Sequence, residues 1–313
     1  MALYAMGPML GPALGPVAGG FIAQYTTWRW VFWSTSILAI SVQFAGILWF
    51  RESHPGTLLK RKRDRLVKET GNKELHVDEK VETLGFKMRQ ALIRPVKLFT
   101  TQPIVTAISI YIAFIFGVAY LIFATFPDIW TGKYGESQGI GSLNYLSTAI
   151  GCFVGLFLNF AFTDKIYKYL KSKNSGEGKP EFRVPMIMAG SILIIVGLFW
   201  YGWSVEGHVH WIMPNIGALI YTTGQICCTQ GMQTYTIDCY QTYAASAMAA
   251  STILRSLLGF AFPLFAPYLY QNLGYGWGTS VLGFISIGIG IPAPVIFWLY
   301  GPKLRGLSKY AAG

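Results

Sequence analysis

Charged residues are scarce in this chain of 313 residues, where they make up 12%, about half of their share in soluble globular proteins. The mean hydropathy is +0.42, and no long apolar run has an acidic residue near its centre. This composition excludes an ordinary soluble domain. Eight apolar runs are long enough to cross a bilayer, which predicts an all-α polytopic membrane protein, because barrel strands are shorter. They lie at about residues 3–24, 30–50, 104–126, 140–162, 184–203, 211–233, 245–270 and 278–300.

Cysteine and catalytic motifs are also sparse. The four cysteines have no metal-ligand spacing, and small apolar core residues are the simpler interpretation. His208 and His210 flank one residue in a predicted outer loop, where weak metal binding and a solvated pair are the two alternatives. There is no glycine-rich phosphate loop and no nucleophile–base pair. The sequence therefore predicts neither an enzyme nor a bound cofactor or metal.

Basic residues are abundant but unevenly placed. The net charge is +11, and residues 51–100 alone hold 13 of the 25 Lys and Arg residues. Six more lie in residues 164–183 and three after residue 300. These segments share one side of the membrane if eight spans alternate, and the positive-inside rule makes that side cytoplasmic. The charge is thus a topology signal rather than a sign of nucleic-acid binding.

The predicted organisation has four parts. Residues 1–50 form two spans, and residues 51–102 form a basic cytoplasmic loop that can carry amphipathic surface helices. Residues 103–300 form six spans, and residues 301–313 form a cytoplasmic tail.

Glycine and proline dominate the first run, which reads GPMLGPALGPVAGG. Gly7, Gly11, Gly15 and Gly19 recur every four residues and therefore share one helix face. Such a face permits close approach of a second helix in a membrane. Internal prolines are tolerated there because neighbouring helices re-satisfy the freed carbonyls.

Four segments in order resemble the fungal drug:proton antiporter branch of the major facilitator superfamily. Residues 15–20 (GPVAGG) resemble the antiporter motif of the fifth span, and residues 94–105 (RPVKLFTTQPIV) resemble the start of the seventh. Residues 180–185 (PEFRVP) resemble the PEYRLP signature before the ninth span. The segment from YTIDCYQTYAAS to YQNLGYGWG resembles the tenth-to-eleventh span region.

The resemblance implies a partial major facilitator fold of about eight transmembrane helices, one six-span half and two spans of the other. It also implies that the chain lacks the first four spans of the family. A complete member rocks two halves about a midplane site. Either the sequence is incomplete at its start or this form does not transport.

The resemblance assigns the opening glycine face to the interface between the halves, packed against Gly151 and Gly155 of the eighth span. Generic helix packing is the alternative. The interface set is Gly7, Gly11, Gly15, Pro16, Gly19, Gly20, Gly151 and Gly155. A cytoplasmic gate is predicted from Asp238 paired with Arg255, with snorkelling of Arg255 to lipid phosphate as the alternative. The other gate candidates are Asp164, Lys165, Glu181 and Arg183, the latter two as anchors of the ninth span.

Aromatic and amide side chains on the seventh, eighth and tenth predicted spans are candidates for a substrate cavity, because rings give adaptable apolar contact and amides orient polar groups. Core-facing or lipid-facing positions are the alternative for about half of them. They are Tyr111, Phe114, Tyr120, Phe123, Asn144, Tyr221, Gln225 and Gln230.

The predicted function is proton-coupled efflux of a small lipophilic drug or fungal secondary metabolite. A polyamine or nutrient carrier and a non-transporting remnant are the alternatives. The expected partners are the lipid bilayer, the substrate and protons, with a monomeric full-length protein. The plasma membrane is the expected location and the vacuolar membrane the alternative.

Overall fold

The computed structural model describes residues 2–52, 55–72, 75–76, 84–306 and 308, which are helical apart from short connections and include no strand. The chain divides into two compact units, residues 26–91 and residues 1–25 together with 92–313. The first helix, α1 (Ala2–Tyr25), packs against helices of the C-terminal segment.

The smaller unit contains α2 (Trp28–Trp49), α3 (Pro55–Thr70) and the first half of α4 (Leu84–Thr101). None of the residues of α2 is buried, and its exposed surface is rich in aromatic and aliphatic side chains. A helix that is apolar all round is suited to lipid. α3 is basic and polar, with Arg65 and Glu69 paired one turn apart at 2.7 Å.

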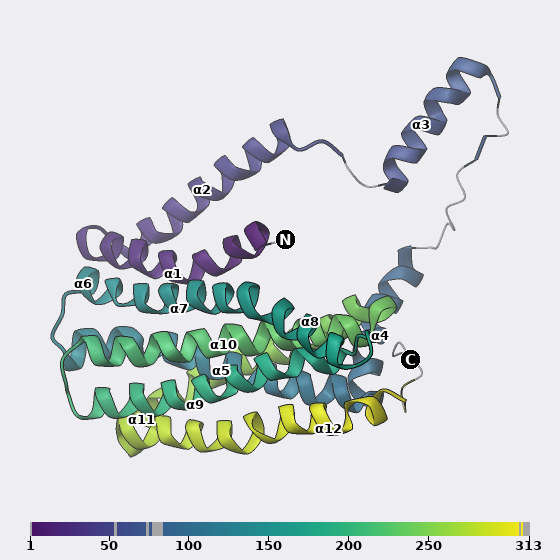
Figure 1. Cartoon of the computed structure of the whole chain (residues 1–313). Coiled ribbons are helices and arrows are strands. Elements are labelled where there is room, and N and C mark those ends of the chain that lie inside the picture. Colours follow the sequence, from purple (N-terminus) through teal and green to yellow (C-terminus); the bar gives the residue numbers. More distant parts are fainter. Residues whose placement is uncertain (1, 53–54, 73–74, 77–83, 307, 309–313) are drawn as a thin grey trace. The chain divides into compact units, whose positions relative to one another are not determined.

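The larger unit is a bundle of long helices that run side by side (Figure 1). Its long helices are α1, α5 (Pro103–Asp128), α7 (Tyr145–Leu158), α9 (Val184–Glu206), α10 (Ile212–Cys239), α11 (Ala244–Gly290) and α12 (Pro292–Gly306). Short elements connect them: η1 (Ile129–Lys133), α6 (Gln138–Leu143), η2 (Asn159–Thr163), α8 (Asp164–Lys173), η3 (Pro180–Arg183) and η4 (Gln241–Tyr243).

Six of the eight predicted spans each lie within one helix, apart from a single residue at an end, whereas 140–162 runs over α6, α7 and η2, and 278–300 runs from α11 into α12. By length and apolarity, five helical stretches of the described chain qualify as membrane spans: Trp28–Trp49, Pro103–Lys133, Gln138–Lys173, Pro180–Glu206 and Gln241–Gly306. The last stretch has 66 residues, which is enough for two passes. Within it, α11 breaks at Gly274, whose φ of 72° and ψ of 173° are not helical. That break lies between the predicted spans 245–270 and 278–300. The all-α, multi-pass fold class is confirmed.

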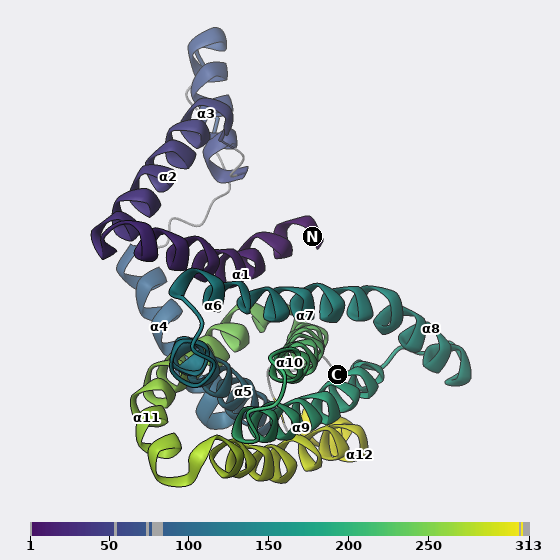
Figure 2. The same cartoon turned by 90° about the vertical axis from the view of Figure 1, so that its left-hand side faces the viewer.

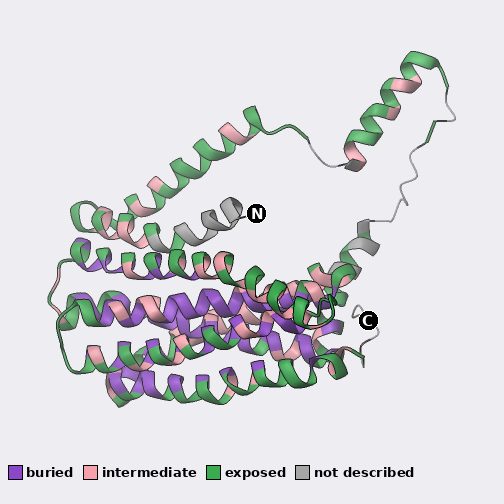
Figure 3. Cartoon of the chain, in the orientation of Figure 1, coloured by how far each residue is buried: buried purple, intermediate pink, exposed green. Residues whose placement is uncertain are grey.

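α10 is the central helix of the bundle. Figure 2 views it nearly end-on, with α7 on one side and α9 on the other. Buried residues concentrate on α5 and α10 (Figure 3). α9 and α10 approach closely at two glycines: a Cβ at Gly217 would lie 2.6 Å from the backbone nitrogen of Tyr201, and one at Gly197 would overlap the backbone of Tyr221. Small residues at such contacts bring two helix backbones together.

Candidate functional site

Charged side chains gather at the end of the bundle that carries Asp164, Arg183, Asp238 and Arg305, here named the basic end. Arg183 donates from Nη1 to Asp164 Oδ1 at 3.0 Å and from Nε to Asp238 Oδ2 at 3.2 Å. Its guanidinium also lies 4.6 Å from the ring centre of Tyr167. The side chain of Arg183 is 15% exposed and that of Asp164 75% exposed. One arginine therefore joins α8, η3 and the last turn of α10.

A second pair fastens the C-terminal helix to the same end. Arg305 donates to both oxygens of Glu181, at 3.1 Å from Nε and 3.3 Å from Nη2. Glu181 is buried, and a Cβ at Gly301 would approach its carboxylate at 2.9 Å. A bidentate, shielded pair of this kind is stronger and more specific than a surface pair. Glu181 and Arg183 thus link η3 to other helices.

The predicted pair of Asp238 with Arg255 is wrong. Asp238 is held by Arg183, which begins α9 beside the end of α10, whereas Arg255 lies along α11 with its guanidinium 4.6 Å from the ring centre of Phe116. Asp164 does contribute to the cluster, but through Arg183. Lys165 lies 5.9 Å from the ring centre of Phe162 instead.

α1 packs against α6 and α7, but Gly151 and Gly155 do not face the glycines of α1, contrary to the prediction. A Cβ at Gly151 would contact Leu219 and Thr222 of α10. A Cβ at Gly155 would contact Thr223 and Ile226 of the same helix. The pairing failed because glycines four apart define a close-packing face but not the helix that fills it.

α1 instead approaches α6 near its own C-terminal end. A Cβ at Gly20 would overlap the side chain of Ser142, and the backbone N–H of Gly139 donates to Gln24 Oε1 at 2.6 Å. A Cβ at Gly11 or Gly15 would meet no described atom within 4 Å. Pro16 and Gly19 are half-buried, and the surroundings of Gly7 lie outside the described residues.

Three of the cavity candidates make hydrogen bonds inside the bundle. The hydroxyls of Tyr111 and Ser191 are 2.7 Å apart, and Tyr221 donates to the carbonyl of Ile115 at 2.9 Å. Asn144 donates to Glu136 Oε2 at 2.8 Å and accepts from Asn215 at 2.6 Å. All three candidates are under 10% exposed, so the structure places them in the packed core and not on an open surface.

Of the other aromatic candidates, Tyr120 and Phe123 form a partly exposed strip on α5, whereas Phe114 is 6% exposed and belongs to the packed core. Phe114 meets Phe262 edge-on at 6.0 Å, and Tyr120 meets Phe123 in the same way at 6.5 Å. Tyr120 is half exposed. Of the two amide candidates on α10, Gln225 is buried and Gln230 is intermediate. The strip is the part of the predicted cavity set that retains accessible apolar surface.

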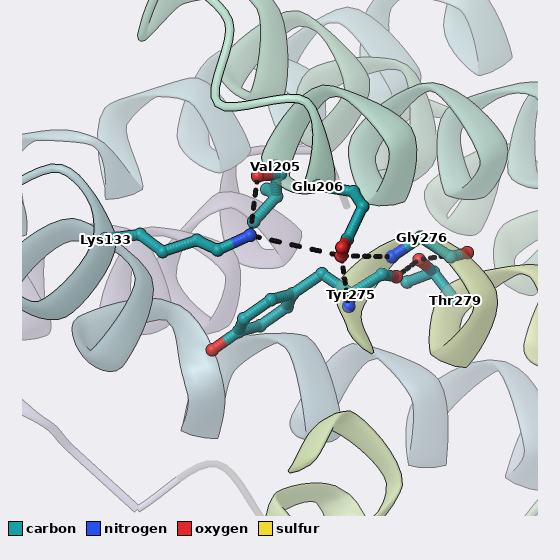
Figure 4. A network of polar contacts seen from close by, with 6 residues as sticks. All are labelled: Lys133, Val205, Glu206, Tyr275, Gly276 and Thr279. Atoms are coloured by element: carbon teal, nitrogen blue, oxygen red, sulfur yellow. Dashed lines mark hydrogen bonds and ion pairs between the residues drawn. The ribbon is translucent and has the colours of Figure 1, made fainter. Parts of the chain in front are cut away.

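Sequence reasoning missed a polar network at the opposite end of the bundle (Figure 4). Glu206 accepts backbone N–H groups of Tyr275 at 2.8 Å and Gly276 at 3.1 Å, and its carboxylate lies 3.9 Å from Lys133 Nζ. Lys133 also donates to the carbonyl of Val205 at 3.0 Å. Glu206 thus caps the helix that restarts after Gly274, where free N–H groups favour an anion. No sequence motif relates the end of η1, the end of α9 and the break in α11.

Tyr134 extends this end of the bundle. It donates to the carbonyl of Val209 at 2.8 Å and stacks on His208, with ring centres 4.8 Å apart. Burial, and then the negative charge of Glu136, raises the pKa of the Tyr134 phenol above its ordinary value, so the hydroxyl keeps its proton and remains a donor across the physiological pH range. No group of three His, Cys, Asp or Glu side chains that could hold a metal is present among the described residues.

A bundle of long apolar helices, bent at glycine and held by ion pairs at its ends, has the form of a multi-pass membrane protein. The model of the Major Facilitator Superfamily matches residues 1–263. The chain belongs to this superfamily.

Its relatives are fungal transport proteins by name. The chain is 63% identical over its whole length to efflux pump vrtL of Penicillium aethiopicum, of which it covers 62%. It is 42% identical to efflux pump radE of Floropilus chiversii, with 99% of the chain and 58% of radE covered. Probable efflux pump mfs2 of Aspergillus flavus is 37% identical, with 99% and 74% covered. The chain thus spans about three fifths of the length of vrtL and radE.

Proposed function

We propose that the protein acts in proton-coupled efflux of small lipophilic compounds, such as drugs or fungal secondary metabolites. The observation that carries the proposal is Arg183, which holds three elements of the bundle together at the basic end through Asp164 and Asp238. Charged contacts at both ends of the bundle, with the aromatic strip of α5 between them, are compatible with the rocking of a helix bundle about a midplane site. The names of the relatives support the same class of activity.

In this proposal the ion pairs of Arg183 close the cytoplasmic side. The pair with Asp164, whose side chain is 75% exposed, contributes little to stability and breaks at small cost when the bundle rocks. The acidic residues of α5, α9 and α10 lie near the helix ends, at Asp128, Glu206 and Asp238. Protonation of Asp238 would remove one of the two carboxylate partners of Arg183, which offers a route by which a proton loosens the gate.

The substrate would contact the aromatic strip, with Tyr120 and Phe123 as the accessible rings. The plasma membrane is the proposed location, with the vacuolar membrane as the alternative, and the full-length protein is proposed to be monomeric. Two further candidates remain: a polyamine or nutrient carrier, and a non-transporting form.

The test is accumulation of fluorescent lipophilic dyes and azole drugs in yeast deleted for its own pumps. The protein is expressed from its complete gene, with Arg183→Gln as the inactive comparison and Arg65→Gln, in the exposed pair of α3, as the matched control. Lower accumulation that a protonophore abolishes supports the proposal. Unchanged accumulation at verified membrane expression contradicts it.

A further inference from the structure

Arg255 lies deep within a helix that the larger unit buries on one side. It is eleven residues beyond the start of α11 at Ala244, or about 16 Å at the helical rise, roughly half the thickness of the hydrocarbon core. A charge at this depth needs a partner or access to water. The structure gives Arg255 no acidic partner among the described residues, since the carboxylate predicted for it belongs to Arg183.

A pocket between α5, α10 and α11 contains the Arg255 side chain. The guanidinium stacks on Phe116, which fixes one of its faces. The pocket is lined by uncharged residues apart from the arginine itself: Ile112, Gln233, Thr236, Met248, Ser251, Thr252 and Arg255. A half-buried cation without an acidic partner among the described residues thus borders a cavity of about 20 Å³, which admits a group about the size of one water molecule, such as a carboxylate oxygen.

Two side chains of the pocket make no hydrogen bond to the described residues, whereas the other polar ones do. Thr252 donates its hydroxyl to the carbonyl of Met248 at 2.9 Å, and Thr236 donates to Met232 at 2.8 Å. Ser251 is paired with Ser109 at 2.9 Å. The guanidinium of Arg255 and the side-chain amide of Gln233 therefore remain as donors. Guanidinium groups bind carboxylates through two parallel hydrogen bonds.

We propose that this pocket is a substrate subsite that binds the acidic oxygen of an aromatic carboxylate or related organic anion. The inference rests on the proposed transport function and narrows its substrate class. The anionic group would pair with Arg255 inside the pocket, while the ring system would lie outside it. The substrate thus supplies the counter-ion that Arg255 lacks, in addition to the neutral compounds expected from the aromatic content.

A lipid phosphate is the competing source of negative charge. Arg255 packs on Phe116 of α5 and lines a pocket shared with α10, whereas an arginine that snorkels extends along its own helix to the headgroups. The geometry therefore favours a soluble organic anion over a headgroup.

The experiment compares two xanthene dyes of similar size, anionic fluorescein and cationic rhodamine 123, with neutral Nile red as a third probe. Efflux is measured for the wild type, Arg255→Gln, Arg255→Lys and the control Arg29→Gln. Binding of fluorescein to the purified protein is measured in parallel by fluorescence polarisation in an uncharged detergent. We expect Arg255→Gln to weaken fluorescein binding and efflux about tenfold or more and to leave Nile red efflux unchanged, with partial rescue by Arg255→Lys.

The two claims fail separately. If no dye is exported but fluorescein binding still depends on Arg255, the transport function is overturned and the subsite stands. If Nile red is exported while fluorescein is neither bound nor exported, the subsite alone is overturned. Equal loss of Nile red and fluorescein in Arg255→Gln, or displacement of bound fluorescein by phosphatidylglycerol, would also overturn it, in favour of a structural role or a lipid site.

Discussion

Arg183 Nε lies 3.2 Å from Asp238 Oδ2, which ties the start of α9 to the end of α10. The side chains of Arg183 and Asp238 are 15% and 32% exposed, so the pair is partly shielded, and its loss costs roughly 1–3 kcal/mol. We expect Arg183→Gln to lower thermal stability modestly and to reduce dye efflux strongly, because it removes two contacts of the proposed gate at once.

The charge swap sharpens this prediction. Arg183→Asp combined with Asp238→Arg restores an ion pair between positions 183 and 238 but not the one to Asp164. Efflux should therefore recover in part relative to either single variant. A double variant no better than the single ones would contradict a role for this pair in gating.

Glu206 provides a prediction about stability at the opposite end. Glu206→Ala leaves the N–H groups of Tyr275 and Gly276 without their acceptor, and we expect a loss of about 1 kcal/mol, as for other helix caps. Glu206→Gln keeps an acceptor oxygen and should cost less, although it removes the charge near Lys133. Thermal unfolding of the purified protein measures both, and equal losses would argue against capping.

The opening glycines offer a matched pair. A Cβ at Gly20 overlaps Ser142, whereas one at Gly15 meets no described atom within 4 Å. Gly20→Ala should therefore push α1 away from α6 and reduce both expression and efflux. Gly15→Ala should be tolerated by the packing shown here and gain helix propensity of roughly 1 kcal/mol. Equal damage from both substitutions would show that Gly15 packs against another helix.

Tyr111 and Tyr120 separate the packed core from the accessible strip. Tyr111→Phe removes the hydrogen bond to Ser191, so we expect a loss of about 1 kcal/mol in stability and no change in which dyes are exported. Tyr120→Ala removes a half-exposed ring and should alter dye preference with little effect on unfolding. A dye panel and thermal unfolding on the same two variants check the assignment.

The lengths of the hydrophobic runs predicted the helices well. Whether a segment is long and apolar enough to cross a bilayer can be read from that segment alone. The break at Gly274 also followed from two separate runs. Partners were not predictable in this way. Several basic residues could pair with Asp238 as far as the sequence shows, and the actual partner depends on how η3 packs against α10. The role of Glu206 depends on how packing brings together the ends of η1 and α9 and the break in α11.

The cavity candidates illustrate the same limit. Tyr111 and Phe114 are three residues apart on one helix, yet Tyr111 points to Ser191 on α9 and Phe114 to Phe262 on α11. Aromatic content alone does not reveal this difference, because a helix buried on several sides presents rings to each neighbour.

The central claim, proton-coupled transport, is tested most directly with the purified protein from its complete gene in sealed liposomes with an imposed pH gradient. Dye movement is followed for the wild type and Arg183→Gln. The account predicts dye movement opposite to the proton flow, abolished by a protonophore and strongly reduced in Arg183→Gln. Dye movement that is the same with and without the gradient, or no movement by correctly folded protein, would contradict it.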